Sequence, residues 1–418
     1  MKEKLTTLGQ WLLIGSVVGV LCGTASALFL WLLERATSYR TGHETIVFAL
    51  PIAGLALGWL MERFGQSIKA GNNLVIDTIH DDGPEIPLRM APMVLVGTVI
   101  THLFGGSAGR EGTAVQMGAS LTDWLSHRLK VNAAVRRQLL AAGVAGGFGS
   151  VFGTPIAGAV FGLEFVVLGR LEYRALVPAL VASIVGDLTT RFLGILHTPY
   201  PASPVVPLNL LLLAKWVVFA AAIALASTSF IELTHFIKKR GEALRLPLRM
   251  ALGGVAVIAL WKLVGSSDYL GLGVPIIVRS FSDPSLPAFA FALKLVFTAI
   301  TVGSGFIGGE VTPLFFIGAA LGSVLARLLG IPIELGAGVG LAAVFAAASN
   351  TPLALSIMAM ELLGAGVFPH VAIVCVLAYL FTGHRSIYPS QRLPFGKLGE
   401  PAGLMKISST REAGPKSS

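Results

Sequence analysis

Residues 105–113 read Gly-Gly-Ser-Ala-Gly-Arg-Glu-Gly-Thr, and this run decides the fold of the chain. Arg110 and Glu111 are the only charged residues between Arg89 and Asp123. A charge inside an apolar, membrane-buried stretch is costly, so it indicates a functional site. The apolar run that follows predicts a helix beginning at or near Glu111. The free N–H groups and the dipole at the start of such a helix favour a bound anion.

Composition places this run in an integral membrane protein. The 418 residues are 54% hydrophobic and 13% charged, whereas a soluble domain carries about 25% charged residues. Mean hydropathy is +0.78. A helix that crosses a ~30 Å hydrocarbon core needs about 20 apolar residues, so the chain has room for roughly ten spans. The 49 glycines and 22 prolines indicate close helix packing and broken helices. Continuous apolar runs disfavour a β-barrel.

The other compositional signals exclude several classes of function. The net charge of +9 fits basic cytoplasmic loops, and no aromatic residues interleave the basic ones as in a nucleic-acid site. Cys22 and Cys375 lie in apolar runs without metal or disulfide spacing. The chain has no GxxxxGK[ST] loop, so we expect no nucleotide and no other cofactor. Residues 5–33 are too long for a signal-peptide core and predict the first membrane helix.

Apolar segments follow one another along the whole chain. We predict helices over 5–33, 45–64, 89–104, 112–127, 134–148, 155–170, 174–195, 208–236, 249–265, 287–303, 311–329, 334–348, 352–366 and 368–382. Residues 69–84 are too short and too polar to span, which predicts a loop leading into a half-helix. Four prolines make 196–207 a natural linker. The division is a first repeat over 1–205, a second over 206–395, and a polar tail over 396–418 that we expect to be disordered.

The two halves repeat each other. At an offset of 200 residues, Thr98 falls on Thr298 and Gly109 on Gly309. At an offset of 197, the Thr-Pro pair at 154–155 and Glu164 match a second Thr-Pro pair and Glu361. Such duplication is typical of transporters with discontinuous helices and a site at the repeat interface.

Each half places one acid at the start of a half-helix. Glu310 is the only charged residue between Lys294 and Arg327, and Pro313 fits a first helical turn. Two such helix starts attract an anion, yet each carboxylate would repel one. The conflict resolves if the acids take up protons, because burial disfavours the charged form. Anion and proton movements would then be linked. The plainer alternative is that Glu111 caps its helix or pairs with Arg110.

With these motifs in place, the chain resembles the CLC family of chloride channels and anion/proton antiporters over roughly residues 8–392. Residues 109–113 resemble the family's GREGP motif, whose Glu is the external gate and proton acceptor, with Thr113 replacing the Pro. Residues 309–313 lie where the family has GxFxP. Asn72 stands in place of the family's central serine, and Tyr388 matches its central tyrosine, which supplies an inner hydroxyl.

The departures from the family pattern resemble those of its fluoride-selective branch. That branch combines GREGT, an Asn or Met in place of the serine, and a Glu in the second-half motif. The chloride/proton antiporters carry paired glutamates where this chain has Glu164 and Phe165, so the internal proton acceptor is missing. The resemblance implies a fluoride/proton antiporter that exports fluoride, with Glu111 as gate and Glu310 in coupling.

The resemblance also implies the fold, the site and the partners. The fold would be all-α, with two inverted repeats and re-entrant helices. The protein would be a multi-pass homodimer of the cell (inner or plasma) membrane, with one pathway per subunit for fluoride and protons. It would be no enzyme and would bind no nucleic acid. The expected anion-binding residues are Asn72, Gly109, Arg110, Gly112, Thr113, Thr312 and Tyr388.

Two alternative functions stay open at this point. A chloride channel or chloride/proton antiporter would share the fold, although Asn72 and Glu310 argue against it. An intramembrane serine hydrolase could use Ser304 or Ser107, but it needs a base beside the serine. We expect His102 to be a hydrogen-bonded core residue, and Glu164 and Glu361 to have structural roles.

Overall fold

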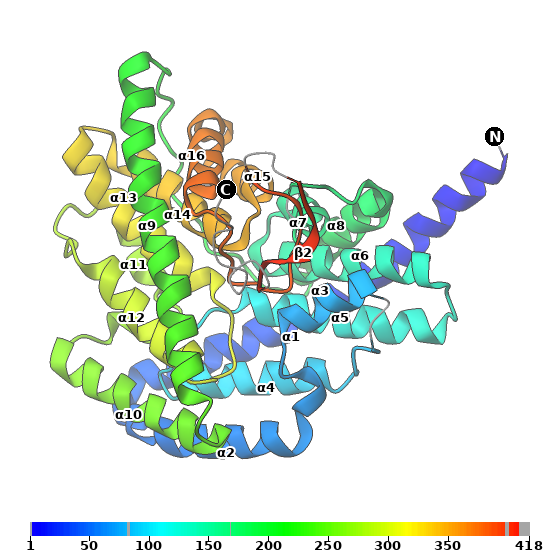
Figure 1. The fold of residues 1–418 in the computed structure, drawn as a ribbon, viewed down its shortest axis with the longest axis horizontal. Helices are drawn as coiled ribbons and strands as arrows, with labels where there is room; N and C mark the ends of the chain where they lie inside the picture. Colours follow the sequence, from blue (N-terminus) through cyan, green and yellow to red (C-terminus); the bar gives the residue numbers. More distant parts are fainter. Residues whose placement is uncertain (1, 82–83, 168, 398–400, 409–418) are drawn as a thin grey trace.

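The computed structural model describes residues 2–81, 84–167, 169–397 and 401–408, and these are mostly helical (Figure 1). The first half comprises α1 (Lys2–Gly42), α2 (Leu50–Phe64), α3 (Asn72–Asp81), α4 (Met90–Leu103), α5 (Glu111–Arg128), α6 (Ala133–Phe152), α7 (Pro155–Glu164) and α8 (Leu176–Phe192). The second half comprises α9 (Leu210–Gly241), α10 (Leu246–Val264), α11 (Val274–Arg279), α12 (Ala290–Gly303), α13 (Val311–Leu329), α14 (Ile333–Ser349), α15 (Pro352–Leu363) and α16 (Phe368–Phe381). A short antiparallel hairpin, β1 (Arg392–Phe395) and β2 (Pro401–Lys406), follows.

Six helical segments within the described residues are long and apolar enough to cross a membrane. They are Leu8–Gly42, Glu44–Phe64, Tyr173–Phe192, Leu210–Gly241, Leu246–Val264 and Val311–Leu329. Several other helices, such as α7 and α15, are apolar but too short to span by themselves. A helix can end within the membrane only where protein or a water-filled cavity surrounds the non-helical backbone that follows it. The protein is therefore a multi-pass membrane protein whose short helices end inside the bundle, as the sequence predicts.

The same helix pairs form in both halves, α5 with α6 and α13 with α14. Both pairs cross at small residues. A Cβ atom on Gly118 would lie 2.3 Å from the carbonyl oxygen of Gly143, and one on Gly318 would lie 2.1 Å from that of Gly340. Only glycine permits so close an approach, which is the usual device for packing membrane helices. Gly118 and Gly318 differ by 200 positions, so the duplication seen in the sequence is also a duplication of packing.

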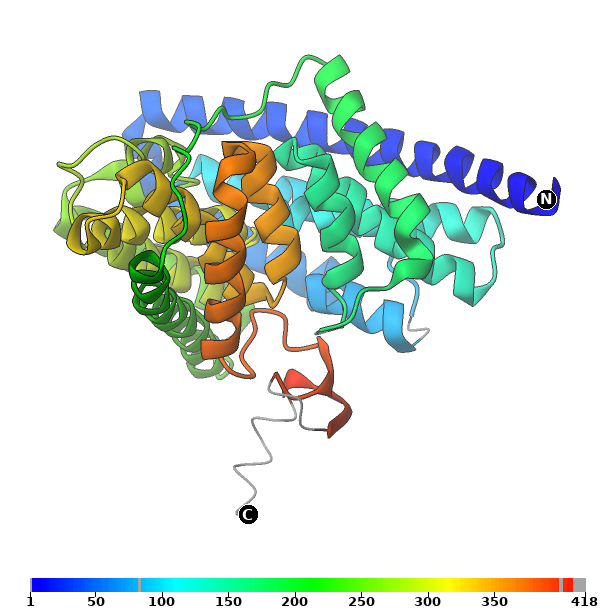
Figure 2. The same ribbon diagram turned by 90° about the horizontal axis from the view of Figure 1, so that it is seen from above.

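The helix bounds differ from the prediction where local chemistry outweighs hydropathy. Helix α1 continues through the polar residues 34–42, and Figure 2 shows its N-terminal end projecting beyond the other helices. Helix α7 ends at Glu164 rather than near 170. Helix α11 has six residues, too few for any periodicity to reveal, and it was not predicted.

The C-terminal tail corrects a prediction. Part of the segment expected to be disordered forms β2, which pairs with β1, and the side chain of Ile407 is buried. Residues 398–400 and 409–418 lie outside the described residues. Hydropathy alone misjudges this segment because its order comes from strand hydrogen bonds, ion pairs and one small apolar contact between Leu393 and Ile407 rather than from a long apolar run. In Figure 2 the hairpin lies on the opposite side of the helices from α1.

Candidate functional site

The loops that precede α5 and α13 meet backbone to backbone. Gly109 donates its N–H to the carbonyl of Gly309 (2.5 Å), and Gly309 donates to the carbonyl of Gly109 (2.8 Å). The two equivalent residues thus form an antiparallel bridge across a local two-fold axis. Ser107 strengthens the junction, because its N–H donates to the Thr301 hydroxyl (3.1 Å) and its Oγ pairs with the Thr298 hydroxyl (2.8 Å). The junction places the starts of α5 and α13 beside each other.

The carboxylate of Glu111 lies across this junction, at the start of the other half's helix. It accepts hydrogen bonds from the Thr312 hydroxyl (2.6 and 2.7 Å) and from the Thr312 N–H (3.1 Å). From its own half, the carboxylate also accepts a hydrogen bond from the Arg110 N–H (3.1 Å) and a longer one from the Arg110 Nε (3.4 Å). Glu111 is fully buried. The carboxylate therefore occupies a position that the N-terminus of α13 makes favourable for an anion.

Glu310 occupies a different environment although it belongs to the equivalent loop. It is the residue that precedes α13, and its side chain makes no capping hydrogen bond there. It is half-buried, and its carboxylate makes no hydrogen bond to another residue in the described ranges. The ammonium of Lys238 lies within electrostatic range of it, and its own backbone N–H is the carboxylate's hydrogen-bond donor. The described part of the chain thus contains one carboxylate bonded to the other half, Glu111, and one that bonds only within its own residue, Glu310.

Asn72 lies directly beside the start of α5. It is the first residue of α3, and its Nδ2 lies 3.1 Å from the point that a Cβ on Gly112 would occupy. Asn72 is buried, and its Oδ1 has no hydrogen-bond partner among the described residues. A buried amide oxygen without a partner is costly. It indicates a site built for something other than packing.

Tyr388 is held by the irregular segment that follows α16. The Tyr388 N–H donates to the Ser386 Oγ (2.9 Å), and the N–H of Ile387 donates to the carbonyl of Ala348 (3.0 Å). The ring packs edge-on against Phe165, with the centroids 4.9 Å apart. Its hydroxyl lies within electrostatic range of both Glu111 and Glu310. The structure therefore places Tyr388 near both carboxylates, although it lies 277 positions after Glu111 in the sequence.

One expected ligand is less available than the sequence suggests. The Thr113 hydroxyl is buried and pairs with the Thr98 hydroxyl (2.7 Å), so it is engaged in packing α5 against α4. Ser107, Thr298 and Thr301 hold the junction together, and the sequence did not predict this role for them. The repeat that matches Thr98 with Thr298 is the sequence signal that points to this part of the chain.

The remaining polar residues have structural roles. The carboxylate of Glu164 accepts from the N–H groups of Leu353 and Ala354 (3.1 and 2.8 Å), at the start of α15. The carboxylate of Glu361 accepts from those of Ile156 and Ala157 (3.0 and 2.7 Å), at the start of α7. Each half thus caps a helix of the other half.

His102 is the hydrogen-bonded core residue that the sequence predicts. Its ring nitrogens lie 2.8 Å from the carbonyl of Thr98 and 2.9 Å from that of Ala108. The Ser107 Oγ pairs with a threonine, and no hydrogen bond from Ser304 to a histidine occurs within the described ranges. The pairing of serine and base that a hydrolase needs is therefore absent from this part of the chain.

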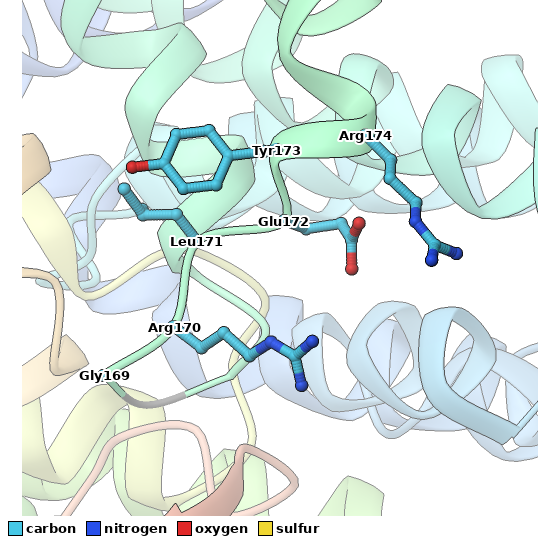
Figure 3. Close-up of a pocket in the computed structure, with 6 residues that line it drawn as sticks. All are labelled: Gly169, Arg170, Leu171, Glu172, Tyr173 and Arg174. Carbon is cyan, nitrogen blue, oxygen red and sulfur yellow. The ribbon is translucent and has the colours of Figure 1, made fainter.

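A surface hollow elsewhere does not belong to this site. It has a volume of about 530 Å³ and is lined by residues 169–174, between α7 and α8. In Figure 3 the charged groups of Arg170, Glu172 and Arg174 point to one side, while the Leu171 and Tyr173 side chains lie on the other. None of the residues around Glu111 lines it.

Comparison with known proteins identifies the family. The model described as voltage gated chloride channel matches residues 53–383. A chloride/fluoride channel protein of Pseudomonas syringae pv. tomato is 46% identical over 409 residues, covering 96% of this chain and 90% of that protein. A ClcB-like chloride channel protein of Ralstonia nicotianae is 30% identical, covering 91% of this chain and 89% of that protein.

Solved structures agree with the sequence relatives. The crystal structure of a CLC-type fluoride/proton antiporter matches with a TM-score of 0.89 and 37% identity, covering 94% of this chain and 99% of that one. A slow cyanobacterial Cl⁻/H⁺ antiporter shares the fold with a TM-score of 0.79 at 20% identity, covering 89% of this chain and 94% of that one. The chain therefore belongs to the CLC family, the family of the voltage gated chloride channels.

Proposed function

We propose that the protein is a fluoride/proton antiporter that exports fluoride from the cytoplasm. The position of the Glu111 carboxylate carries this proposal. It takes both the N–H and the hydroxyl of Thr312, the donors that an anion at the start of α13 would use. An anion and the ionised carboxylate therefore exclude each other from this position.

Protonation decides which of the two occupies the position. A neutral carboxyl group loses the attraction that a helix start exerts on a negative charge. It then leaves the Thr312 donors free for an anion, and when the anion departs the ionised group can return. One proton uptake thus accompanies the entry of one anion. Glu310 lies beside the same helix start, its carboxylate makes no hydrogen bond to another of the described residues, and we assign it to the relay of protons and the passage of the anion.

Two relatives and two side chains support fluoride as the anion. The 46% identical relative is named a chloride/fluoride channel protein, and the 37% identical structure is that of a fluoride/proton antiporter. Fluoride is small and strongly hydrated, so its site needs compact donors that replace water. The Asn72 amide and the Tyr388 hydroxyl would supply such donors in addition to those of Thr312. A chloride channel or chloride/proton antiporter is the alternative for the same fold.

The proton gradient would supply the driving force. A difference of one pH unit is worth about 1.4 kcal/mol, which at one proton per fluoride supports about a tenfold fluoride gradient. We further propose that the protein acts in the cell membrane as a homodimer with one pathway in each subunit. The CLC family resemblance supports this assembly. A molecular mass in detergent that corresponds to a single subunit would contradict the homodimer.

The test is a halide comparison in liposomes. Purified protein is reconstituted, the vesicles are loaded with fluoride or with chloride, and anion release and proton uptake are recorded together. We expect fluoride release with stoichiometric proton uptake and much slower chloride release. Equal rates for the two halides would contradict fluoride selectivity, and fluoride release without proton uptake would indicate a channel.

A further inference from the structure

Helix α3 and the Tyr388 segment are joined by hydrogen bonds next to the two proposed donors. Ser390 donates its N–H to the Asn73 Oδ1 (3.0 Å) and its hydroxyl to the Asp77 Oδ2 (3.0 Å). Asn73 is the neighbour of Asn72, and Ser390 lies two residues beyond Tyr388. We name Asn73, Asp77 and Ser390 the α3 latch. It connects α3, which carries the Asn72 amide, to the segment that carries the Tyr388 hydroxyl.

On its other side the Tyr388 segment is fixed to the helix bundle by Gln391. This residue is fully buried. Its Nε2 donates to the carbonyls of Phe165 (2.9 Å) and Ser349 (2.7 Å), and its Oε1 accepts from Ser386 (2.7 Å) and Asn350 (3.2 Å). A buried amide with every donor and acceptor used defines its surroundings closely. The segment is thus anchored to the bundle, and the α3 latch anchors α3 to the segment.

Two basic side chains of the C-terminal hairpin lie close to the Asp77 carboxylate of the latch. The Lys406 Nζ lies 2.7 Å from the Asp77 Oδ1, and the Arg392 guanidinium lies 3.9 Å from the same atom. The side chain of Asp77 is 30% exposed, so water screens these ion pairs. The latch therefore contributes little to overall stability. Its effect is local, on the distance between α3 and the segment.

We propose that Asp77 and Ser390 are positioning residues that hold the Asn72 amide and the Tyr388 hydroxyl at a fixed separation. This proposal rests on the fluoride/proton exchange proposed above. Asn72 begins a helix and Tyr388 lies in an irregular segment, so neither is placed by regular secondary structure alone. If α3 and the Tyr388 segment move apart, a hydrated anion can pass between them before Glu111 has taken up a proton. Such passage carries fluoride without a proton, and it admits chloride more readily.

The experiment weakens the latch at its Ser390–Asp77 bond without touching the proposed donors, while the bond from the Ser390 N–H to Asn73 stays in place. Asp77→Asn and Ser390→Ala are made singly and together, reconstituted as full-length protein, and assayed for fluoride release, proton uptake and chloride release. Losing a hydrogen bond to a charged group shifts a local equilibrium by roughly tenfold or more. We therefore expect both single variants to lower the proton-to-fluoride ratio and the fluoride-to-chloride rate ratio. The double variant should be no worse than the worse single one, because both break one connection.

Two control variants separate positioning from a general loss of structure. Ser390→Thr keeps the hydroxyl and should retain the wild-type ratios. Glu232→Gln breaks an exposed ion pair with Arg385 (2.9 Å) close to the same segment, and it should also leave both ratios unchanged. Thermal melting in detergent reports folding independently of transport. A variant that is folded and loses coupling therefore supports the proposal.

Wild-type ratios in folded Asp77→Asn and Ser390→Ala protein would overturn the latch, as would equal losses in Glu232→Gln. If instead the proposed fluoride/proton exchange is wrong, the wild-type protein itself will release fluoride without proton uptake. In that case the fluoride-to-chloride rate ratio still tests the latch. It should fall in Ser390→Ala and stay unchanged in Ser390→Thr.

Discussion

The two half-helix loops have the same backbone and different chemistry. Gly109 and Gly309 are equivalent and bond to each other, but the acids that follow are out of step by one residue. Glu111 is the first residue of its helix, whereas Glu310 precedes its helix. That single step lets the Glu111 carboxylate reach Thr312 in the other half, and it leaves the Glu310 carboxylate without a bond to another residue within the described ranges. Duplication thus built a symmetric frame, and a shift of one position produced two distinct carboxylates.

A second pair of acids shows what happens without such a shift. Glu164 and Glu361 occupy matched positions, and each caps the start of a helix in the other half through two N–H groups. Their roles are the same because their positions are the same. The difference between the two pairs teaches that symmetry serves stability in this fold, and that departure from symmetry marks the proposed transport site.

The largest expected effect comes from the bonded carboxylate. Glu111→Gln keeps the shape of the side chain but cannot exchange a proton. We expect proton-coupled fluoride release to fall by roughly a hundredfold or more, the scale seen when a positioned proton carrier is removed. Simultaneous fluoride and pH electrodes on liposomes measure this. Full coupled flux in the variant would remove Glu111 from the gating role.

A smaller effect is expected from the Glu310 carboxylate. Glu310→Gln leaves the Glu111–Thr312 contact intact, so the exclusion between anion and carboxylate persists. We expect coupled transport to slow by roughly tenfold, less than the hundredfold or more that a positioned proton-transferring group contributes. The same electrodes give the rate. A loss as large as that of Glu111→Gln would mean that the two acids act as one unit and would weaken the contrast drawn here.

The Thr312 hydroxyl should matter less again. Thr312→Val removes the shortest bond to Glu111 while the backbone N–H remains. A hydrogen bond to a charged group contributes about 1.5–3 kcal/mol, and the remaining donor offsets part of its loss. We expect a several-fold lower proton-to-fluoride ratio, because the carboxylate returns to its position less reliably. Thr312→Ser keeps the hydroxyl and serves as the matched control. If both variants lose coupling equally, the hydroxyl is not responsible.

The symmetric pair should give the smallest effect, and it should be on stability alone. Glu164→Gln and Glu361→Gln each weaken a helix cap, which costs about 1 kcal/mol and lowers the melting temperature by a few degrees. The two losses should be similar because the contacts are equivalent. Melting curves and the fluoride assay are run on the same preparations. A selective loss of coupling in either variant would place that acid on the proton path.

Much of this organisation could be predicted from sequence. The isolated charges at Glu111 and Glu310, the flanking glycines and the repeat offsets predict two half-helices that meet, because a charge at membrane depth beside glycines is typical of a broken helix at a binding site. The family resemblance added Asn72 and Tyr388. The contact between Glu111 and Thr312 could not be predicted, because it joins residues 201 positions apart and depends on the register of the Gly109–Gly309 bridge.

The residues around the α3 latch were missed for a different reason. Asp77, Ser390 and Gln391 lie in polar stretches, where most such side chains face water. Nothing in composition separates Gln391, whose amide is fully buried, from an exposed glutamine. The hairpin was missed for a similar reason, since its order comes from strand hydrogen bonds, ion pairs and a two-residue apolar cluster, which are too few to give a hydropathy signal.

The bridge between Gly109 and Gly309 also has a consequence for biosynthesis. Each loop supplies the peptide groups that the other needs, so the first half cannot complete its loop while it is alone in the bilayer. A ribosome adds about 5–20 residues per second, so the partner loop, about 200 residues later, emerges about 10–40 s after the first. During that interval the nascent chain holds an unfinished polar loop among apolar helices. Insertion machinery or a chaperone would therefore have to shelter the first half until the second arrives.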